Sequence, residues 1–292
     1  MVHSKNQLKS TMELMLDGWI DDLDPTWHAI LGNSSLGFSA MDPDLSLEPW
    51  EPVFPVRRKQ TLLGAPQHGH LFRAFDGINP NDVRCLILGQ DPFPCPAFST
   101  GRAFEAGNTA HWKELEKITL SPSMRCFLQS VCTAKTGEHK FIRGIKAWHE
   151  TIQAIENCEI NIPSPPKLLD AWRSEGVLAL NSALTISRFK KEGDPHQLRG
   201  HSPLWRPLLL DTIVGLAAIP NQTILILAFG GIAAELVLSA QHMLKNAPNY
   251  STTILPVFAP HPAMGADFLA AENPFLKGNT LLLERGLLPI FW

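Results

Sequence analysis

The chain carries, at residues 86–93, the stretch Leu86-Ile87-Leu88-Gly89-Gln90-Asp91-Pro92-Phe93, in which an apolar run passes abruptly into polar residues. The run begins at Arg84 and has the length and composition of a strand that is buried on both faces. Three more runs of this kind follow, at 177–180, 223–228 and 253–258, and each is succeeded by Gly, Asn or Pro. These four runs predict the strands of one sheet.

Segments of helical length and apolar spacing separate or precede these runs: 124–134, 142–155, 167–174, 203–217 and 232–244. Strands that alternate with helices favour a parallel sheet that is covered by helices on both faces. We therefore expect an α/β protein of three layers, α/β/α, around a central, mainly parallel sheet of four strands.

The N-terminal part has a different composition. Residues 8–20 have helical periodicity, and residues from 21 to about 60 are rich in Pro, Asp, Ser and Gly. We expect two parts: an N-terminal helix and irregular arm at 1–60, and an α/β domain at 61–292 that holds the functional residues.

The composition excludes several classes of protein. Of the 292 residues, 45% are hydrophobic and 18% are charged, so the chain can bury a large core. A net charge of -3 argues against a protein that coats nucleic acid by bulk attraction, although a local basic patch stays compatible with it. The five cysteines are odd in number and form no Cys-x-x-Cys pair, which indicates neither a disulfide framework nor a zinc or iron–sulfur site. Residues 1–19 lack the continuous apolar centre of a signal peptide or membrane span. We expect a cytoplasmic protein with no membrane association, no metal and no cofactor.

Polar residues and glycines follow the predicted strands directly. In parallel α/β sheets, ligands bind beyond the carboxyl ends of the strands. At those places the sequence has an acid, Asp91, an amide, Asn181, a glycine turn, Gly230-Gly231, and a histidine, His261. We expect these residues to converge on one edge of the sheet.

Several stretches resemble, in order and spacing, the family 1 uracil-DNA glycosylases. The stretch at 89–93 resembles the family's water-activating loop, G-Q-D-P-Y-H, at the end of the first core strand. Further matches are Gly176-Val177-Leu178-Ala179-Leu180-Asn181 to G-V-L-L-L-N, His261-Pro262 to the start of H-P-S-P-L-S, and residues 284–292 to the close R-G-x-x-P-I-D-W. The ordered set covers roughly the last three quarters of the chain, and it is far more specific than any one match. The resemblance implies the uracil-DNA glycosylase fold, DNA as the partner and a monomeric state.

The resemblance assigns catalytic roles to Asp91 and His261. Breaking an N-glycosidic bond builds positive charge on the sugar and negative charge on the departing base, so it needs a carboxylate on one side and a hydrogen-bond donor on the other. Asp91 would orient a water and stabilise the sugar cation, and His261 would donate a hydrogen bond to the pyrimidine O2. Without the motif, Asp91 would be read as a turn residue and His261 as a packed loop histidine.

The resemblance also implies a pocket for the base, formed by Gln90, Phe93, Phe104 and Asn181. The base must leave the helical stack before its bond to the sugar becomes accessible. Phe104 resembles the aromatic residue on which the flipped base stacks, and Asn181 resembles the side chain that hydrogen-bonds the pyrimidine edge. Taken alone, Phe104 would be a core residue and Asn181 a helix N-cap.

Candidates for binding the DNA backbone come from three places. Pro122-Ser123 resembles the family's Pro-Ser loop at the phosphates, and Gly230 and Gly231 open a helix at which N–H groups can approach a phosphate. The basic stretch 188–201 either adds charge to this edge or is a solvated loop, and both interpretations stay open.

Departures from the family pattern cluster at the pocket and at the DNA-facing loop. Phe93 replaces the Tyr that blocks substituents at the pyrimidine C5, Pro94 replaces His, and residues 95–100 differ as well. Gly265 replaces the leucine that fills the vacated space in the DNA helix, which leaves the flexible, apolar Met264 as the nearest candidate wedge. A weaker wedge favours single-stranded DNA, or a partner or second loop that assists opening of double-stranded DNA.

Two substrates are compatible with these departures: uracil, and a pyrimidine enlarged at C5, such as a hydroxymethylated or glucosylated cytosine of a virus. Excision of the second would make the protein an antiviral defence enzyme. Asn181 suits either base, since rotation of its amide exchanges donor and acceptor.

The alternative from another class is a catalytically inactive DNA-binding module of the same fold. The sequence contains neither the G-x-S-x-G motif of serine hydrolases nor a P-loop. His68 and His70 lie one residue apart in a Gln-Gly loop, where we expect them to be exposed rather than bound to a metal.

Overall fold

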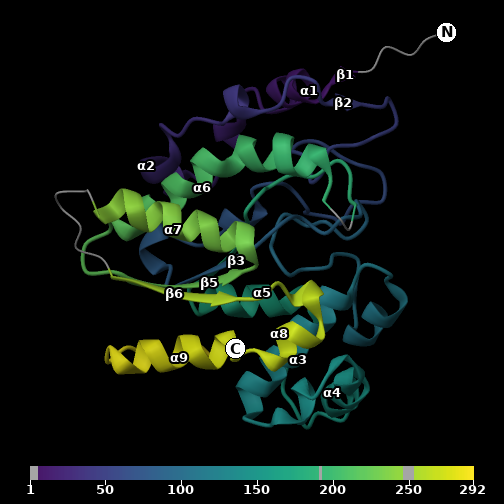
Figure 1. The fold of residues 1–292 in the computed structure, drawn as a ribbon, viewed down its shortest axis with the longest axis vertical. Coiled ribbons are helices and arrows are strands. Elements are labelled where there is room, and N and C mark those ends of the chain that lie inside the picture. Colours follow the sequence, from purple (N-terminus) through teal and green to yellow (C-terminus); the bar gives the residue numbers. More distant parts are fainter. Residues whose placement is uncertain (1–5, 191–192, 246–252) are drawn as a thin grey trace.

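The computed structural model describes residues 6–190, 193–245 and 253–292, and its centre is a sheet of four strands. The strands are β3 (Cys85–Gly89), β4 (Val177–Asn181), β5 (Thr223–Phe229) and β6 (Thr253–Ala259). Their order is β4-β3-β5-β6, and every neighbouring pair is parallel (Figure 1). The predicted parallel sheet is confirmed: the run at 84–88 is shifted by one residue from β3, and each of the other three runs lacks only the last residue of its strand.

Both faces of the sheet are apolar and each lies under its own core. Because successive side chains of a strand alternate, Leu86 and Leu88 of β3 enter one core, whereas Cys85 and Ile87 enter the other. Helices α6 (Ser202–Ala217) and α7 (Gly231–Lys245) cover the first face, with α1 (Leu8–Met15) and α2 (His28–Leu31) outside them (Figure 1). The second face is covered by α3 (Pro122–Thr136), α4 (Trp148–Glu156), α5 (Pro165–Ser174), α8 (Ala266–Ala270) and α9 (Pro274–Glu284). The three-layer α/β/α architecture is therefore confirmed.

Four of the five predicted helices in the α/β domain have counterparts of similar extent, and the fifth is wrong over its first part. A helix was predicted over 142–155, but α4 begins only at Trp148. The chain turns at Gly144, whose φ of +149° a helix cannot accommodate, and then forms a short 3₁₀ turn, η8 (Ile145–Ala147). Helix α9 was not predicted, although Asn273-Pro274 is a start signal: the Asn273 side chain accepts hydrogen bonds from the backbone of Phe275 and Leu276.

The N-terminal residues pack into the first core rather than away from it. Trp27 is fully buried, donates from Nε1 to the Ile78 carbonyl at 2.9 Å, and meets the Phe75 ring edge-on with 4.9 Å between centroids. A small antiparallel pair, β1 (Asn6–Gln7) and β2 (Ser46–Leu47), closes this segment. The boundary near residue 60 stays a prediction. Among the described helices, none combines the length and apolar character needed to cross a bilayer.

Candidate active site

The polar residues predicted from the sequence lie at the carboxyl ends of the four strands. Asp91 follows β3, and Asn181 ends β4 directly opposite Gly89. Gly230 follows β5, and His261 follows β6. The topology explains the arrangement: the chain passes from β3 to β4 on one side and then to β5 on the other, and parallel α/β sheets bind ligands beyond the strand ends at the point where this direction reverses.

The Asp91 carboxylate is held by two neutral amides. Gln90 donates from Nε2 to Oδ2 at 3.0 Å. Gln197, which the sequence did not single out, donates from Nε2 to Oδ1. Burial raises the pKa of Asp91 to about 6, while the hydrogen bonds from Gln90 and Gln197 act in the opposite direction. The group is therefore ionised at neutral pH in a poorly solvated position, which suits a carboxylate that must stabilise positive charge.

The His261 ring is neutral and oriented by its own loop. Burial lowers the pKa of His261. The backbone N–H of Ala263 donates to Nδ1 at 3.1 Å, so Nδ1 carries no proton and the ring proton resides on Nε2. Gly230 packs against the side chain, since a Cβ on Gly230 would lie 3.2 Å from Cβ of His261. The loop thus presents a neutral imidazole with one N–H donor.

Phe104 lies between Asn181 and His261. One face of its ring stacks on Phe127 of α3, with centroids 4.2 Å apart and planes 8° from parallel, and its centroid is 6.5 Å from that of His261. A Cβ built on Gly89 would come within 2.6 Å of Oδ1 of Asn181 and 3.4 Å of Cε2 of Phe104. Gly89, Asn181 and Phe104 are therefore close neighbours, and Phe104 in turn neighbours His261.

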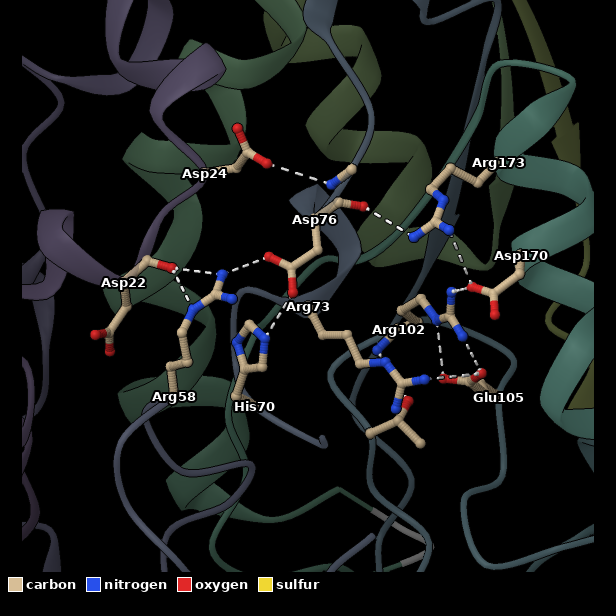
Figure 2. A network of polar contacts seen from close by, with 12 residues as sticks. Asp22, Asp24, Arg58, His70, Arg73, Asp76, Arg102, Glu105, Asp170 and Arg173 are labelled. Carbon is tan, nitrogen blue, oxygen red and sulfur yellow. Dashed lines mark hydrogen bonds and ion pairs between the residues drawn. The ribbon is translucent and has the colours of Figure 1, made fainter. Parts of the chain in front are cut away.

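The Phe104 backbone has an unusual conformation that a buried ion-pair network supports. Its φ of +55° is rare for an aromatic residue. Two residues earlier, Arg102 donates from Nε to Glu105 at 2.9 Å and from Nη1 to Asp170 of α5 at 2.7 Å, while the neighbouring Ala103 N–H donates to the carbonyl of Ala179 in β4. Figure 2 shows Arg102 between these two carboxylates. The contacts of Arg102, Ala103 and Glu105 therefore fix both sides of the turn that carries Phe104.

The same network corrects the prediction for His70. The side chain is buried, and Nε2 is 2.8 Å from Oδ2 of Asp76, which also pairs with Arg58 at 2.5 Å (Figure 2). His68 is exposed as expected. The error arose because the loop folds back under the Asp76 turn, and no local pattern records this. A cavity of about 580 Å³ opens beside the network, but neither Asp91 nor His261 lines it.

The loop after Asp91 carries an aromatic pair. Phe93 is half-buried, and its ring centroid is 5.4 Å from that of Phe98, at a tilt of 58°. The loop is compact, because Cys95 donates its N–H to the Phe93 carbonyl and Phe98 donates to the Cys95 carbonyl. Gln90 was predicted to bind the base, but in the structure its side-chain amide donates a hydrogen bond to Asp91. Its role toward a base stays a prediction.

The loop after His261 exposes apolar side chains. Met264 ends the 3₁₀ turn η10 (Pro262–Met264) and is 54% exposed. Gly265 is buried beneath Ile145 of η8, whose Cδ1 would lie 2.8 Å from a Cβ at that position. Ile145 is itself 44% exposed, so a second apolar side chain stands beside Met264. Sequence reasoning missed Ile145 because it belongs to a different segment.

The predicted phosphate-binding residues lie at two helix starts. Pro122 and Ser123 form the first turn of α3 rather than a loop, and Pro122 is exposed. Gly231 is exposed and begins α7, with no atom within 4 Å of a Cβ built on it. In the basic stretch 188–201, Arg188 pairs with Glu51 and Arg199 with Asp42 at 2.5 Å, both in the N-terminal arm. Lys191 lies outside the described residues.

Comparison with known proteins identifies uracil-DNA glycosylases as relatives. No protein-family model matches the chain. The uracil-DNA glycosylase of Exiguobacterium sibiricum is 23% identical over 255 residues, covering 86% of this chain and 93% of that protein. The uracil-DNA glycosylase of a Parafrankia species is 26% identical over 274 residues, covering 93% of this chain and 96% of that protein.

Solved structures share the fold. The wild-type UNG of Nitratifractor salsuginis superimposes with a TM-score of 0.56 at 22% identity, over 98% of this chain and 99% of that one. The mimivirus uracil-DNA glycosylase superimposes with a TM-score of 0.57 at 18% identity, over 100% of this chain and 95% of that one. The relatives named here are uracil-DNA glycosylases, and the chain has the fold of solved uracil-DNA glycosylase structures.

Proposed function

We propose that the protein is a DNA glycosylase that binds an extruded pyrimidine nucleotide and hydrolyses its N-glycosidic bond, leaving an abasic site. One observation carries the proposal: an ionised carboxylate, Asp91, and a neutral imidazole with an N–H at Nε2, His261, follow strand ends at one edge of the sheet, where Phe104 and Asn181 also lie. A developing sugar cation needs the first group, and a departing base that gains negative charge needs the second.

The reaction assigns each group a step. The bond between C1′ and the base nitrogen breaks, and its electron pair leaves with the base, whose O2 accepts a hydrogen bond from Nε2 of His261. The Asp91 carboxylate stabilises the positive sugar, and a water adds its oxygen to C1′. The proton that the water loses passes to Asp91, and the base anion gains a proton from solvent.

Phe104 and Asn181 are the groups proposed to read the base. Phe127 covers one face of the Phe104 ring, so a base can stack only on the other face. Asn181 is 3% exposed, and its side-chain oxygen lies next to Gly89 at the end of β3. A largely buried amide at the strand ends suits a base edge, because buried polar groups discriminate strongly between ligands that satisfy their hydrogen bonds and ligands that do not.

The proposed substrates are uracil and pyrimidines enlarged at C5. The Phe93–Phe98 pair supports the second as well as the first, since this wall is built differently from the family's Tyr loop. Cleavage of hydroxymethylated or glucosylated cytosine would make the protein an antiviral defence enzyme. We propose a monomer, in line with the family resemblance.

A substrate panel tests the function directly. Oligonucleotides carrying one uracil, 5-hydroxymethylcytosine or glucosylated cytosine, each single- and double-stranded, are incubated with the protein and then with alkali, which breaks the strand at abasic sites. We expect cleavage of at least one modified strand and none of unmodified DNA. Because Gly265 stands where the family has its wedging leucine, we expect faster release from single strands. If no strand is cut, the protein is the alternative: an inactive DNA-binding module.

Gly89→Ala tests the packing of the pocket. The added methyl group would overlap Oδ1 of Asn181, and overpacking of this kind costs about 1–3 kcal/mol. If Asn181 and Phe104 shift, the excision rate falls by roughly 10- to 100-fold. Single-turnover rates measure the effect, with thermal unfolding as a check on folding. Gly89→Val should be worse than Gly89→Ala, and wild-type rates in both would contradict the placement of the base beside Gly89.

A further inference from the structure

Gln197 contacts Asp91 from a distant part of the chain. It begins η9 (Gln197–His201), a turn of π-helix before α6, and lies 106 residues from Asp91 in the sequence. Its side chain is buried, with 4% exposure, and its Nε2 donates to Oδ1 of Asp91. Since Gln90 serves the other carboxylate oxygen, each oxygen of Asp91 has one amide donor.

The other end of the Gln197 amide has no partner. Its Oε1 is buried and accepts no hydrogen bond from any described residue. Buried acceptors in native proteins are nearly always satisfied, so an orphan acceptor beside a candidate catalytic group indicates a water or ligand that completes it. The orientation of the amide is set by its neighbour, because an ionised carboxylate accepts from the NH₂ group and repels the oxygen.

A chain of buried hydrogen bonds holds the Gln197 segment. Trp205 has only a donor, and its Nε1 donates to Thr185 at 2.7 Å. Thr185 then contacts Nδ1 of His201 at 2.8 Å, Nε2 of His201 contacts Ser187 at 3.0 Å, and Ser187 contacts Nδ1 of His196 at 3.0 Å. The chain of contacts is thus continuous from the indole of Trp205 to the imidazole of His196. Such satisfied networks fix the position of the residues they join, and here they fix the residue next to Gln197.

The backbone of the same segment is capped. The carbonyl of Asp194 accepts from the N–H of Gln197 at 3.0 Å, and its carboxylate accepts from the N–H of His196 at 2.9 Å. Gln197 is therefore immobilised before any DNA binds. By contrast, Pro94, three residues after Asp91 in the loop, has no polar side-chain atom to offer.

We propose that Gln197 is the positioning residue of this reaction: its amide nitrogen fixes Asp91, and its amide oxygen accepts a hydrogen bond from the attacking water. The inference rests on the proposed glycosylase function. A water that donates one hydrogen to Oε1 and the other to Asp91 keeps a lone pair for C1′. As its oxygen bonds to C1′, the proton facing Asp91 moves to the carboxylate, and the bond from C1′ to the base breaks.

Two variants and a control separate positioning from mere packing. Gln197→Leu keeps the volume and removes both amide atoms, and Gln197→Glu keeps an oxygen acceptor but places a second acid beside Asp91. Gln153→Leu, on the exposed side of α4, is the control. Single-turnover excision by wild-type protein should decline as the pH falls through about 6, because the pKa of Asp91 is raised to about 6 and the ionised form is the active one.

In Gln197→Leu, the rate at pH 8 should fall roughly 10- to 100-fold, since a hydrogen bond to a charged group is lost. The acidic limb of the pH–rate profile, where the rate declines as Asp91 is protonated, should move upward by about one pH unit. The reason is that the lost hydrogen bond from Gln197 favoured the ionised form of Asp91. Gln197→Glu should move this acidic limb further, because a second carboxylate then lies beside Asp91, and the remaining partner of Asp91 among the described residues is the neutral amide of Gln90. If the variants lose rate equally at all pH values and the acidic limb of their pH–rate profile does not move, the proposal is overturned and Gln197 is a packing residue.

A readout without DNA keeps this inference distinct from the proposed function. The carboxyl carbon of Asp91 can be followed by NMR in protein labelled with ¹³C-aspartate, and assigned by its loss in Asp91→Asn. We expect its titration midpoint to move upward from wild type to Gln197→Leu to Gln197→Glu, even if no substrate is cleaved. An unchanged midpoint in both variants overturns the role of Gln197, whereas a shifted midpoint in a protein that cuts no substrate overturns only the proposed function.

Discussion

Asp91→Asn is expected to abolish base release while DNA binding is retained. The substitution preserves the shape of the side chain and removes the charge that stabilises the sugar cation and accepts the water's proton. Groups in such roles contribute on the order of 10²–10⁴-fold each, and Asp91 combines two of them. We therefore expect the single-turnover rate to fall by about 10³-fold or more.

The measurement pairs excision with affinity. Fluorescence anisotropy of a labelled oligonucleotide gives the Kd of each variant, and Asp44→Asn, an exposed aspartate of the arm, is the matched control. The Kd of Asp91→Asn should stay within a few-fold of wild type. Equal losses of affinity and excision would instead make Asp91 a structural residue and favour the inactive binding module.

His261→Ala is expected to slow excision by about 10²–10³-fold, the usual effect of deleting one donor to a developing anion. The neutral ring donates from Nε2, since Ala263 occupies Nδ1, and the hydrogen bond strengthens only as charge reaches the base. The expected effect is therefore on the chemical step rather than on binding.

A change of leaving group distinguishes this role from a structural one. A more acidic base, such as 5-fluorouracil, leaves with less help, so His261→Ala should lose less of its rate on 5-fluorouracil than on uracil. The exposed His28 of α2 supplies the control, as His28→Ala. Equal losses on both bases would mean that His261 maintains the loop and makes no contact with the departing base.

Much of the fold could be predicted because its signals are local. A parallel strand buried on both faces requires a continuous apolar run, and the four runs placed all strands of the sheet. Errors occurred where a backbone feature interrupted a pattern: the spacing over 142–155 is helical, but the turn at Gly144 delays α4 to Trp148.

The site was predicted only as far as its residues adjoin strand ends. Asp91, Asn181 and His261 could be named because a parallel sheet brings the ends of its strands to one edge. Gln197 carried no comparable signal, since it lies in a turn before α6 and meets Asp91, 106 residues away, only in the tertiary structure. Ile145 was missed for the same reason, because its neighbour Gly265 is far along the chain.

The sequence by itself determined the strands, most of the helices and the residue types at the strand ends, because hydrophobic periodicity and short motifs act over a few neighbouring residues. Only the tertiary structure decided which side chains meet: Gln197 with Asp91, Phe104 with Phe127, and His70 with Asp76. Such pairings depend on the direction of each side chain and on how distant loops return to the sheet. No periodic pattern along the chain records either quantity.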